Sequence, residues 1–267
     1  MTAKSQAHFT INDLSLRFGG LKVLSDITLD VAAGEVVGLI GPNGAGKSAL
    51  LNCISGIYRP QTGQVRLAGQ PLDHSSPHAV SAAGIGRTFQ HANLLASMTV
   101  LENVLIGLSS ELRQGVLHRL FRPLASVGNE KHARAKAMRA LERCTIAQYA
   151  DMNVGTLSLG NRKKVDLARA LVSEPKLLLL DEPAAGLSRD ERSLIPQLVR
   201  SALAENPIGV IWIEHDLELV ISAATRVAVL QQGRVVATGN PAGGESERQR
   251  LINAYLHGNA NPQSATT

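Results

Sequence analysis

The sequence of 267 residues predicts an α/β fold in which a mainly parallel sheet carries a second, helical lobe. Strand-sized apolar runs alternate with helical patterns, which is typical of a parallel sheet covered by helices on both faces. A mostly helical stretch at residues 98–150 interrupts this alternation and predicts the second lobe. A glycine-rich loop joins one apolar run to the next helix, as in folds that bind anions at a helix N-terminus.

The elements before the helical stretch follow from periodicity and turn residues. Residues 8–31 alternate apolar and polar positions around Gly19-Gly20 and predict a pair of strands. The other predicted elements of this half are a buried strand at 35–40, a helix at 49–57, a turn at 61–63 and a short strand at 65–68.

The second half begins with helices and ends with strands. Helical periodicity in the stretch 98–150 is expected to break at Gly107, Gly115, Pro123 and Gly128. The later elements are buried strands at 177–181 and 208–214, then a hairpin of strands 226–230 and 234–237 around Gln232-Gly233.

Composition limits the class of protein. Hydrophobic residues make up 44% of the chain, which is ordinary for a globular protein. Aromatic residues make up only 3%, which disfavours a nucleic-acid surface built on stacked rings. No apolar run approaches the roughly 18 residues that suggest a membrane span. Because the N-terminus is polar and lacks the build of a signal peptide, we expect a cytoplasmic protein.

Positive charge is concentrated in the helical stretch. The chain has a formal net charge of +5, and residues 111–143 contain eight Lys or Arg against three Glu. These side chains either face an anionic partner, such as lipid headgroups or nucleic acid, or form a solvated helix face. The sequence leaves both interpretations open.

A phosphate-binding loop is the most specific motif of the sequence. The pattern G-x-x-x-x-G-K-[ST] is completed, between a strand and a helix, by Gly41, Pro42, Asn43, Gly44, Ala45, Gly46, Lys47 and Ser48. Backbone N–H groups of such a loop form a concave anion site. Lys47 supplies a positive charge for the β- and γ-phosphates, and the Ser48 hydroxyl is a hard oxygen ligand suited to Mg²⁺. The motif predicts a P-loop NTPase with a RecA-like core.

A pair of carboxylates follows the later buried strand. Four leucines, Leu177 to Leu180, precede Asp181 and Glu182. The carboxyl edge of a parallel sheet is where ligands bind, so both acids are predicted to reach the nucleotide. We expect Asp181 to hold Mg²⁺ through its water shell and Glu182 to polarise the attacking water.

The remaining motifs make the chain resemble the ATP-binding subunits of ABC transporters. Leu157-Ser158-Leu159-Gly160-Asn161, about 20 residues before Asp181, is similar to the LSGGQ signature. The resemblance implies that Ser158, Gly160 and Asn161 face the γ-phosphate held by a second subunit. A narrower resemblance, to branched-chain amino-acid importers, rests on Arg17-Phe18-Gly19-Gly20, Arg87-Thr88-Phe89-Gln90, the segment 98–104, Ile213-Glu214-His215-Asp216 and Ala254-Tyr255-Leu256.

The resemblance also implies roles for single residues. Gln90 takes the place of the loop glutamine that senses Mg²⁺ and touches the membrane subunit, and His215 that of the switch histidine at the γ-phosphate. Phe18 takes the place of the ring that stacks on adenine, with a core phenylalanine as the alternative. The chain departs from the commonest family pattern at Ala49 beside the α-phosphate, and at Leu159, Asn161 and Ser188.

One ABC nucleotide-binding domain is therefore expected over residues 1–267. Residues 8–92 and 166–240 would form the ATP-binding core with a small antiparallel β-subdomain. Residues 93–165 would form an inserted helical subdomain that carries the signature, and residues 241–267 a C-terminal helix with a frayed tail.

The implied function is ATP hydrolysis that powers an importer of branched-chain amino acids or of a related small polar solute, such as urea or amides. The implied cofactors are ATP and Mg²⁺. The implied partners are integral membrane permease subunits, a second ATP-binding subunit and, indirectly, a periplasmic or extracellular solute-binding protein. The chain would lie on the cytoplasmic face of the inner or plasma membrane, with no nucleic acid.

Two alternatives stay open at the level of sequence. A soluble ABC ATPase that acts on nucleic acid or on the ribosome would explain the basic insert. A weakly active regulatory subunit that binds nucleotide would explain the departures at Ala49, Asn161 and Ser188.

Overall fold

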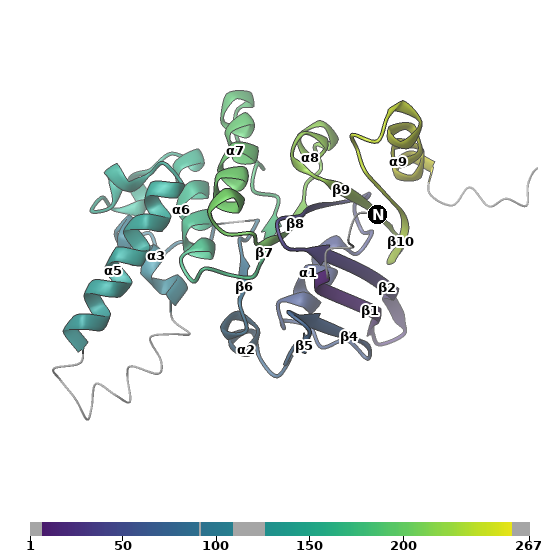
Figure 1. The fold of residues 1–267 in the computed structure, drawn as a ribbon, viewed down its shortest axis with the longest axis horizontal. Coiled ribbons are helices and arrows are strands. Elements are labelled where there is room, and N and C mark those ends of the chain that lie inside the picture. Colours follow the sequence, from purple (N-terminus) through teal and green to yellow (C-terminus); the bar gives the residue numbers. More distant parts are fainter. Residues whose placement is uncertain (1–6, 91, 109–125, 258–267) are drawn as a thin grey trace, which may run out of the picture.

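A computed structural model describes residues 7–90, 92–108 and 126–257. Two β-sheets and a helical lobe make up the fold (Figure 1). The larger sheet has the order β10-β9-β3-β8-β7-β6 and is parallel except for β10, which is antiparallel to β9. Its strands are β3 (Val36–Ile40), β6 (Ile85–Arg87), β7 (Leu177–Asp181), β8 (Gly209–Ile213), β9 (Arg226–Gln231) and β10 (Arg234–Gly239). The predicted α/β class is confirmed.

The central strands are continuous apolar runs because both of their faces are covered. Leu178 and Leu180 pack into a core shared with the helical lobe, whereas Leu177 and Leu179 pack into a core shared with the smaller sheet. Successive side chains of a strand point to opposite faces, so each core receives every second leucine. The run of four leucines thus fills two cores at once.

The smaller sheet is antiparallel, with the order β2-β1-β4-β5. Its strands are β1 (Ala7–Phe18), β2 (Leu21–Ala32), β4 (Thr62–Leu67) and β5 (Gln70–Pro71). The turn predicted at 61–63 is wrong, since Thr62 and Gly63 belong to β4. Gly63 has φ 96°, and a Cβ there would lie 2.5 Å from the Leu14 Cα across a register shift between β1 and β4. This glycine therefore permits a close approach of two strands.

The helical lobe lies at one end of the molecule, beyond β6 and β7 (Figure 1). It contains α3 (Val100–Leu105), α5 (Ser126–Arg143) and α6 (Leu159–Leu171), with 3-10 turns at Ile106–Leu108, Ala147–Tyr149 and Val154–Thr156. The break at Gly107 is confirmed, because α3 ends before it. The break at Gly128 is wrong: this residue lies within α5, where one glycine costs only about 1 kcal/mol. Gly115 and Pro123 lie outside the described residues.

The basic stretch is described only in part. Arg113, Arg119 and Arg122 lie outside the described residues. Lys131 and Arg139 are exposed on α5, and so is Arg134, whose Nη2 lies 3.7 Å from the Asp151 carboxylate. The opposite face of α5 packs Ala137 and Leu141 into the core of the lobe, so this helix has one apolar face and one charged face.

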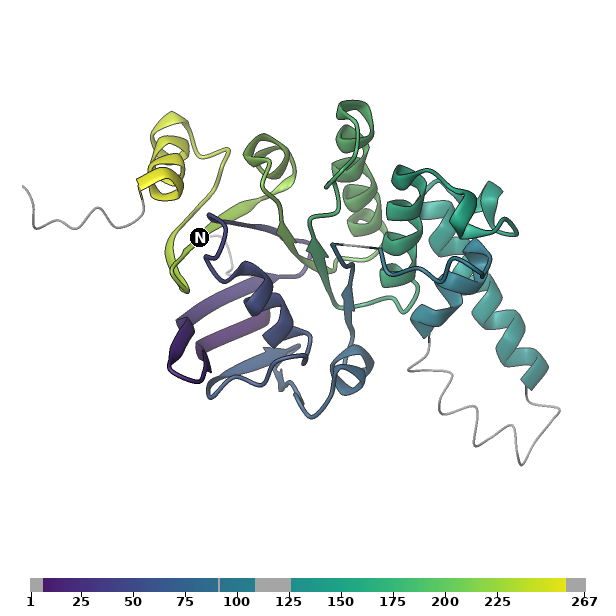
Figure 2. The ribbon, with the colours of Figure 1, turned by 180° about the vertical axis from the view of Figure 1, so that it is seen from behind.

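The remaining helices cover the larger sheet (Figure 2). They are α1 (Lys47–Ile54), α2 (Pro77–Ala82), α7 (Arg189–Glu205), α8 (Leu217–Ala223) and α9 (Glu245–His257). Leu50 and Leu51 of α1 join the core beneath the smaller sheet, and Ile195 of α7 joins the core of the helical lobe. Across the described ranges, we find no helix with the length and apolarity that a membrane crossing requires.

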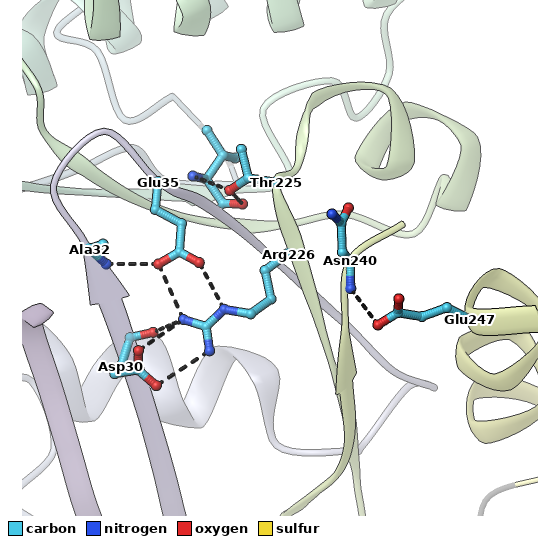
Figure 3. A network of polar contacts seen from close by, with 8 residues as sticks. Asp30, Ala32, Glu35, Thr225, Arg226, Asn240 and Glu247 are labelled. Carbon is cyan, nitrogen blue, oxygen red and sulfur yellow. Dashed lines mark hydrogen bonds and ion pairs between the residues drawn. The ribbon is translucent and has the colours of Figure 1, made fainter. Parts of the chain in front are cut away.

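An arginine fixes the amino ends of neighbouring strands (Figure 3). Arg226, the first residue of β9, donates from Nε to Glu35 Oε1 at 2.8 Å and from Nη2 to Asp30 Oδ2 at 3.2 Å. The Glu35 carboxylate also accepts from the Ala32 N–H at 2.7 Å. These contacts tie the end of β2 to the starts of β3 and β9 and leave the carboxyl ends of the parallel strands for the site.

Candidate active site

The phosphate loop joins β3 to α1, and its shape requires glycine. A Cβ on Gly41 would lie 2.1 Å from the Leu230 carbonyl oxygen, and Gly44 and Gly46 have φ 79° and 105°. Gly46 precedes the first turn of α1, and in the described part of the chain no side chain caps that turn. The N–H groups of this turn and those of the loop therefore suit the anion site that the motif predicts.

Lys47 is buried in this loop. Its Nζ donates to the Gly41 carbonyl at 2.6 Å and to the Pro42 carbonyl at 3.0 Å. Burial lowers the pKa of the Lys47 ammonium, while the charges of Glu182 and Asp181 oppose that shift. The ammonium group therefore lies between the loop and the carboxyl edge of β7. The other loop residues differ in exposure: Pro42, Asn43, Gly44 and Ser48 are exposed, Ala49 is half-buried and Ala45 is buried.

Asp181 ends β7 and is paired with an arginine. Arg87 Nη2 lies 2.9 Å from Asp181 Oδ2, and each side chain is 9% exposed. Arg87 also donates to Asn52 Oδ1 in α1 at 2.8 Å and to Ser55 Oγ, just past the end of α1, at 2.6 Å. The guanidinium therefore fixes the carboxylate relative to the helix that begins at the phosphate loop. No pattern in the sequence indicates this role, because β6, which ends at Arg87, is too short to show a strand periodicity.

Three segments bring Gln90, Glu182 and His215 together. Gln90 Nε2 donates to Glu182 Oε2 at 3.0 Å, and His215 Nε2 lies 2.8 Å from Glu182 Oε1. Glu182 has φ 48°, a left-handed conformation that is uncommon outside glycine, and its N–H donates to the Ile213 carbonyl at 3.0 Å. Each of the three residues follows a strand of the parallel sheet, so the structure places all three at one edge. This carboxylate is positioned to accept a proton from a water molecule.

A second buried carboxylate supports this group. Glu214, 5% exposed, accepts from the Ala184 N–H at 2.8 Å and from the His215 N–H at 3.3 Å. Burial raises the pKa of Glu214, and the two N–H donors oppose that shift. Glu214 thus joins the loop after Glu182 to the segment that carries His215. The sequence indicates no buried role for Glu214, since an acid that follows a strand is usually solvated.

The signature residues lie elsewhere, at the start of α6. The Ser158 hydroxyl accepts from the Asn161 N–H at 3.3 Å and caps this helix. Gly160 lies against the Glu191 carboxylate, 2.3 Å from where a Cβ would stand. In Figure 1, α6 belongs to the helical lobe, whereas α1 lies near the centre of the molecule, between the two sheets. One chain therefore presents the signature and the phosphate loop as two separate surfaces.

Ser188 and Phe18 take up distinct local environments. Ser188 caps α7 in a capping box with Glu191, whose Oε2 accepts from the Ser188 N–H at 3.0 Å. A serine thus serves this helix start as well as an aspartate would. Phe18 ends β1, is 49% exposed and meets the Tyr58 ring edge-on at 5.0 Å between centroids. Its exposure excludes the core alternative and leaves about half of the residue open to solvent.

The fold and this edge of the sheet define a P-loop nucleotide-binding protein. A family model described as ABC transporter matches residues 24–185. The chain is 36% identical over 248 residues to the branched-chain amino acid transport ATP-binding protein BraF of Pseudomonas aeruginosa, covering 92% of this chain and 96% of BraF. It is 35% identical over 254 residues to LivG of Escherichia coli K12, covering 94% and 98%.

A solved structure supports the same assignment. The ADP conformation of MJ1267, an ATP-binding cassette of an ABC transporter, matches with a TM-score of 0.78 and 32% identity, covering 95% of this chain and 96% of that one. The chain belongs to the ABC transporter family. It is an ATP-binding cassette, and its family couples ATP hydrolysis to transport.

Replacing the exposed ring at the end of β1 is expected to weaken ATP binding selectively. We expect Phe18→Ala to raise the KM for ATP about 5-fold, because a base stacked on one half-exposed ring contributes about 1 kcal/mol. The kcat is expected to change by less than about 2-fold, because Phe18 makes no contact with Glu182. Steady-state kinetics of the variant and of Phe18→Trp, which keeps a stacking face, measure both constants. An unchanged KM in Phe18→Ala would contradict the role.

Proposed function

We propose that this chain hydrolyses ATP to power the import of branched-chain amino acids or of a related small polar solute, such as urea or an amide. The observation that carries the proposed ATP hydrolysis is the convergence of Gln90 and His215 on the Glu182 carboxylate, beside the phosphate loop. The similarity to BraF and LivG, both named high-affinity branched-chain amino acid transport proteins, supports the solute class.

ATP would bind with its phosphates in the loop of residues 41–48 and its adenine on Phe18. Lys47 would release the two loop carbonyls and turn to the β- and γ-phosphates. The Ser48 hydroxyl, the Asp181 carboxylate and the Gln90 amide oxygen are all oxygen donors, the ligand type that Mg²⁺ requires. These residues would hold Mg²⁺, which supplies neutralisation of phosphate charge.

Hydrolysis would follow from the position of Glu182. Its carboxylate accepts the proton of the attacking water, while Gln90 and His215 fix the two carboxylate oxygens. His215, 45% exposed, would also contact the γ-phosphate. Ser158, Gly160 and Asn161 of a second ATP-binding chain would cover the γ-phosphate, because they lie away from the phosphate loop of their own chain.

We assign residues 8–92 and 166–240 to the ATP-binding core with its β-subdomain, residues 93–165 to the helical signature subdomain and residues 241–267 to a C-terminal segment. The proposed boundary at 165/166 falls within α6, so the later part of this helix would be assigned to the core. We further assign the chain to the cytoplasmic face of a membrane, bound to permease subunits and served by a solute-binding protein outside.

Purification from native membranes tests the proposal. We expect the tagged chain, isolated in mild detergent, to bring down integral membrane subunits and a second ATP-binding chain. A strain that lacks this protein is expected to lose high-affinity uptake of radiolabelled leucine. Uptake of radiolabelled urea and short amides is measured in the same strain, to test the related solutes. Recovery of ribosomes or nucleic acid in place of membrane subunits, with normal uptake of every solute, would contradict it.

A further inference from the structure

The helix that begins with the signature carries a buried lysine that the proposed mechanism does not use. Lys163, in the second turn of α6, is 6% exposed. Its Nζ donates to the Gln90 carbonyl at 2.6 Å and to the Glu182 carbonyl at 3.2 Å. One ammonium group therefore holds the backbone of two residues whose side chains meet at the candidate active site.

The same face of α6 holds the segment that contains Gln90. Asp166, one turn after Lys163 and 1% exposed, accepts from the Phe89 N–H at 3.1 Å. Arg169, a further turn along, pairs with Asp166 and donates to the Asn93 carbonyl at 2.8 Å. Residues spaced by three lie on one side of a helix, so these three side chains form one row. The row fixes the segment before and after Gln90 to α6.

The charges around Lys163 support this arrangement. Burial lowers the pKa of the Lys163 ammonium, and four carboxylates oppose that shift, namely those of Asp166, Glu214, Glu182 and Asp181. Hydrogen bonds from a buried charged donor are stronger than neutral ones and resist displacement by water. Two hydrogen bonds of the Lys163 ammonium therefore bind the backbone of the residues that meet at the Glu182 carboxylate.

We propose that Lys163 is a positioning residue for ATP hydrolysis, which holds the Gln90 and Glu182 backbones in place from the signature helix. The inference rests on the proposed function, since it assigns Glu182 to the reaction. Because Ser158 caps α6, a displacement of this helix when a second chain's nucleotide meets Ser158 would move Lys163 with it. Binding of a second chain's nucleotide at Ser158 would therefore change the position of Glu182 in the same chain as that Ser158.

Three variants of the assembled transporter test the proposal. Lys163→Met keeps the length of the side chain and removes both hydrogen bonds. We expect its kcat to fall roughly 10-fold, with the KM for ATP within about 2-fold, because ATP itself does not touch Lys163. Lys163→Arg keeps a charged donor and is expected to recover most of the lost kcat.

Lys164→Met is the matched control on the same helix. The Lys164 Nζ donates to the exposed Thr145 hydroxyl at 3.4 Å, so its kcat should stay within about 2-fold of the wild type. Fluorescence of Trp212, the single tryptophan and a buried one, reports unfolding in urea for every variant. If Lys163→Met does not fold, Lys163→Gln, which keeps an N–H donor, replaces it with an expected fall of about 3-fold.

The outcomes separate the two proposals. A normal kcat in folded Lys163→Met, a rise in KM in place of the fall in kcat, or a failure of Lys163→Arg to recover activity would each overturn the positioning role. ATP hydrolysis by the wild type and by Lys164→Met would support the proposed function in all three cases. A wild-type complex that hydrolyses no ATP would overturn both.

Discussion

Glu182→Gln is expected to lower the kcat for ATP hydrolysis about 100-fold or more while nucleotide still binds. An amide has nearly the shape of the carboxylate but cannot accept the proton of the attacking water. The phosphate loop and Lys47 are untouched by this change, so affinity for ATP should stay within about 3-fold. Steady-state hydrolysis and equilibrium binding of labelled ATP measure the two quantities separately.

The same variant should also accumulate as a closed pair of chains. ATP held between the phosphate loop of one chain and the signature of another joins the two chains until it is hydrolysed. Because the variant hydrolyses ATP slowly, the two chains are expected to stay joined. Size-exclusion chromatography with ATP and Mg²⁺ detects the pair. Glu218→Gln, an exposed glutamate at the start of α8, is the matched control and should hydrolyse ATP normally. Normal turnover by Glu182→Gln would show that another group takes the proton.

Much of the fold was predictable because its signals are local. The strand β7 has the bounds predicted for it, since four leucines that fill two cores leave no alternative to a doubly covered strand. The hairpin of β9 and β10 turns at Gln232 and Gly233, which have φ 44° and 74°, as a tight hairpin turn demands. Both elements are specified by a few adjacent residues.

Elements that depend on distant contacts were harder to predict. The strand β6 has three residues and is a strand only because β7 lies beside it. Its place between two apolar runs predicts a turn at Gly63, whereas this glycine lets β1 approach β4. Local propensity predicts a helix break at Gly128, but the packing of the remainder of α5 outweighs the cost of one glycine. In each case tertiary packing decided what local propensity left open.

Some residues of the candidate site can likewise be predicted from local sequence, whereas others depend on distant contacts. The loop residues and the pair Asp181-Glu182 are visible in the sequence because their spacing is fixed by one turn and one strand end. Lys163 is not, since it stands between Arg162 and Lys164 in a basic run typical of a solvated face. Only the packing of α6 on the Gln90 segment buries this one member of the run. No periodicity distinguishes it from its neighbours.

Lys47→Ala is expected to produce the opposite separation, a loss of nucleotide binding. Charge-assisted hydrogen bonds to two phosphates contribute roughly 3 kcal/mol, so the affinity for ATP should fall about 100-fold. The stability of the fold should change little. Removal of the ammonium removes the free-energy cost of burying its charge. Water can replace it as the donor to the Gly41 and Pro42 carbonyls, because the outer residues of the loop are exposed.

Binding of labelled ATP and urea unfolding followed through Trp212 distinguish lost binding from lost folding. Lys176→Ala, an exposed lysine just before β7, is the control and should bind ATP as the wild type does. Because Glu182→Gln keeps binding and loses turnover while Lys47→Ala loses binding itself, the two variants assign separate tasks to two charges on one edge of the sheet. If Lys47→Ala bound ATP normally, the ammonium would serve only to hold the loop carbonyls, and the phosphates would rest on backbone N–H groups alone.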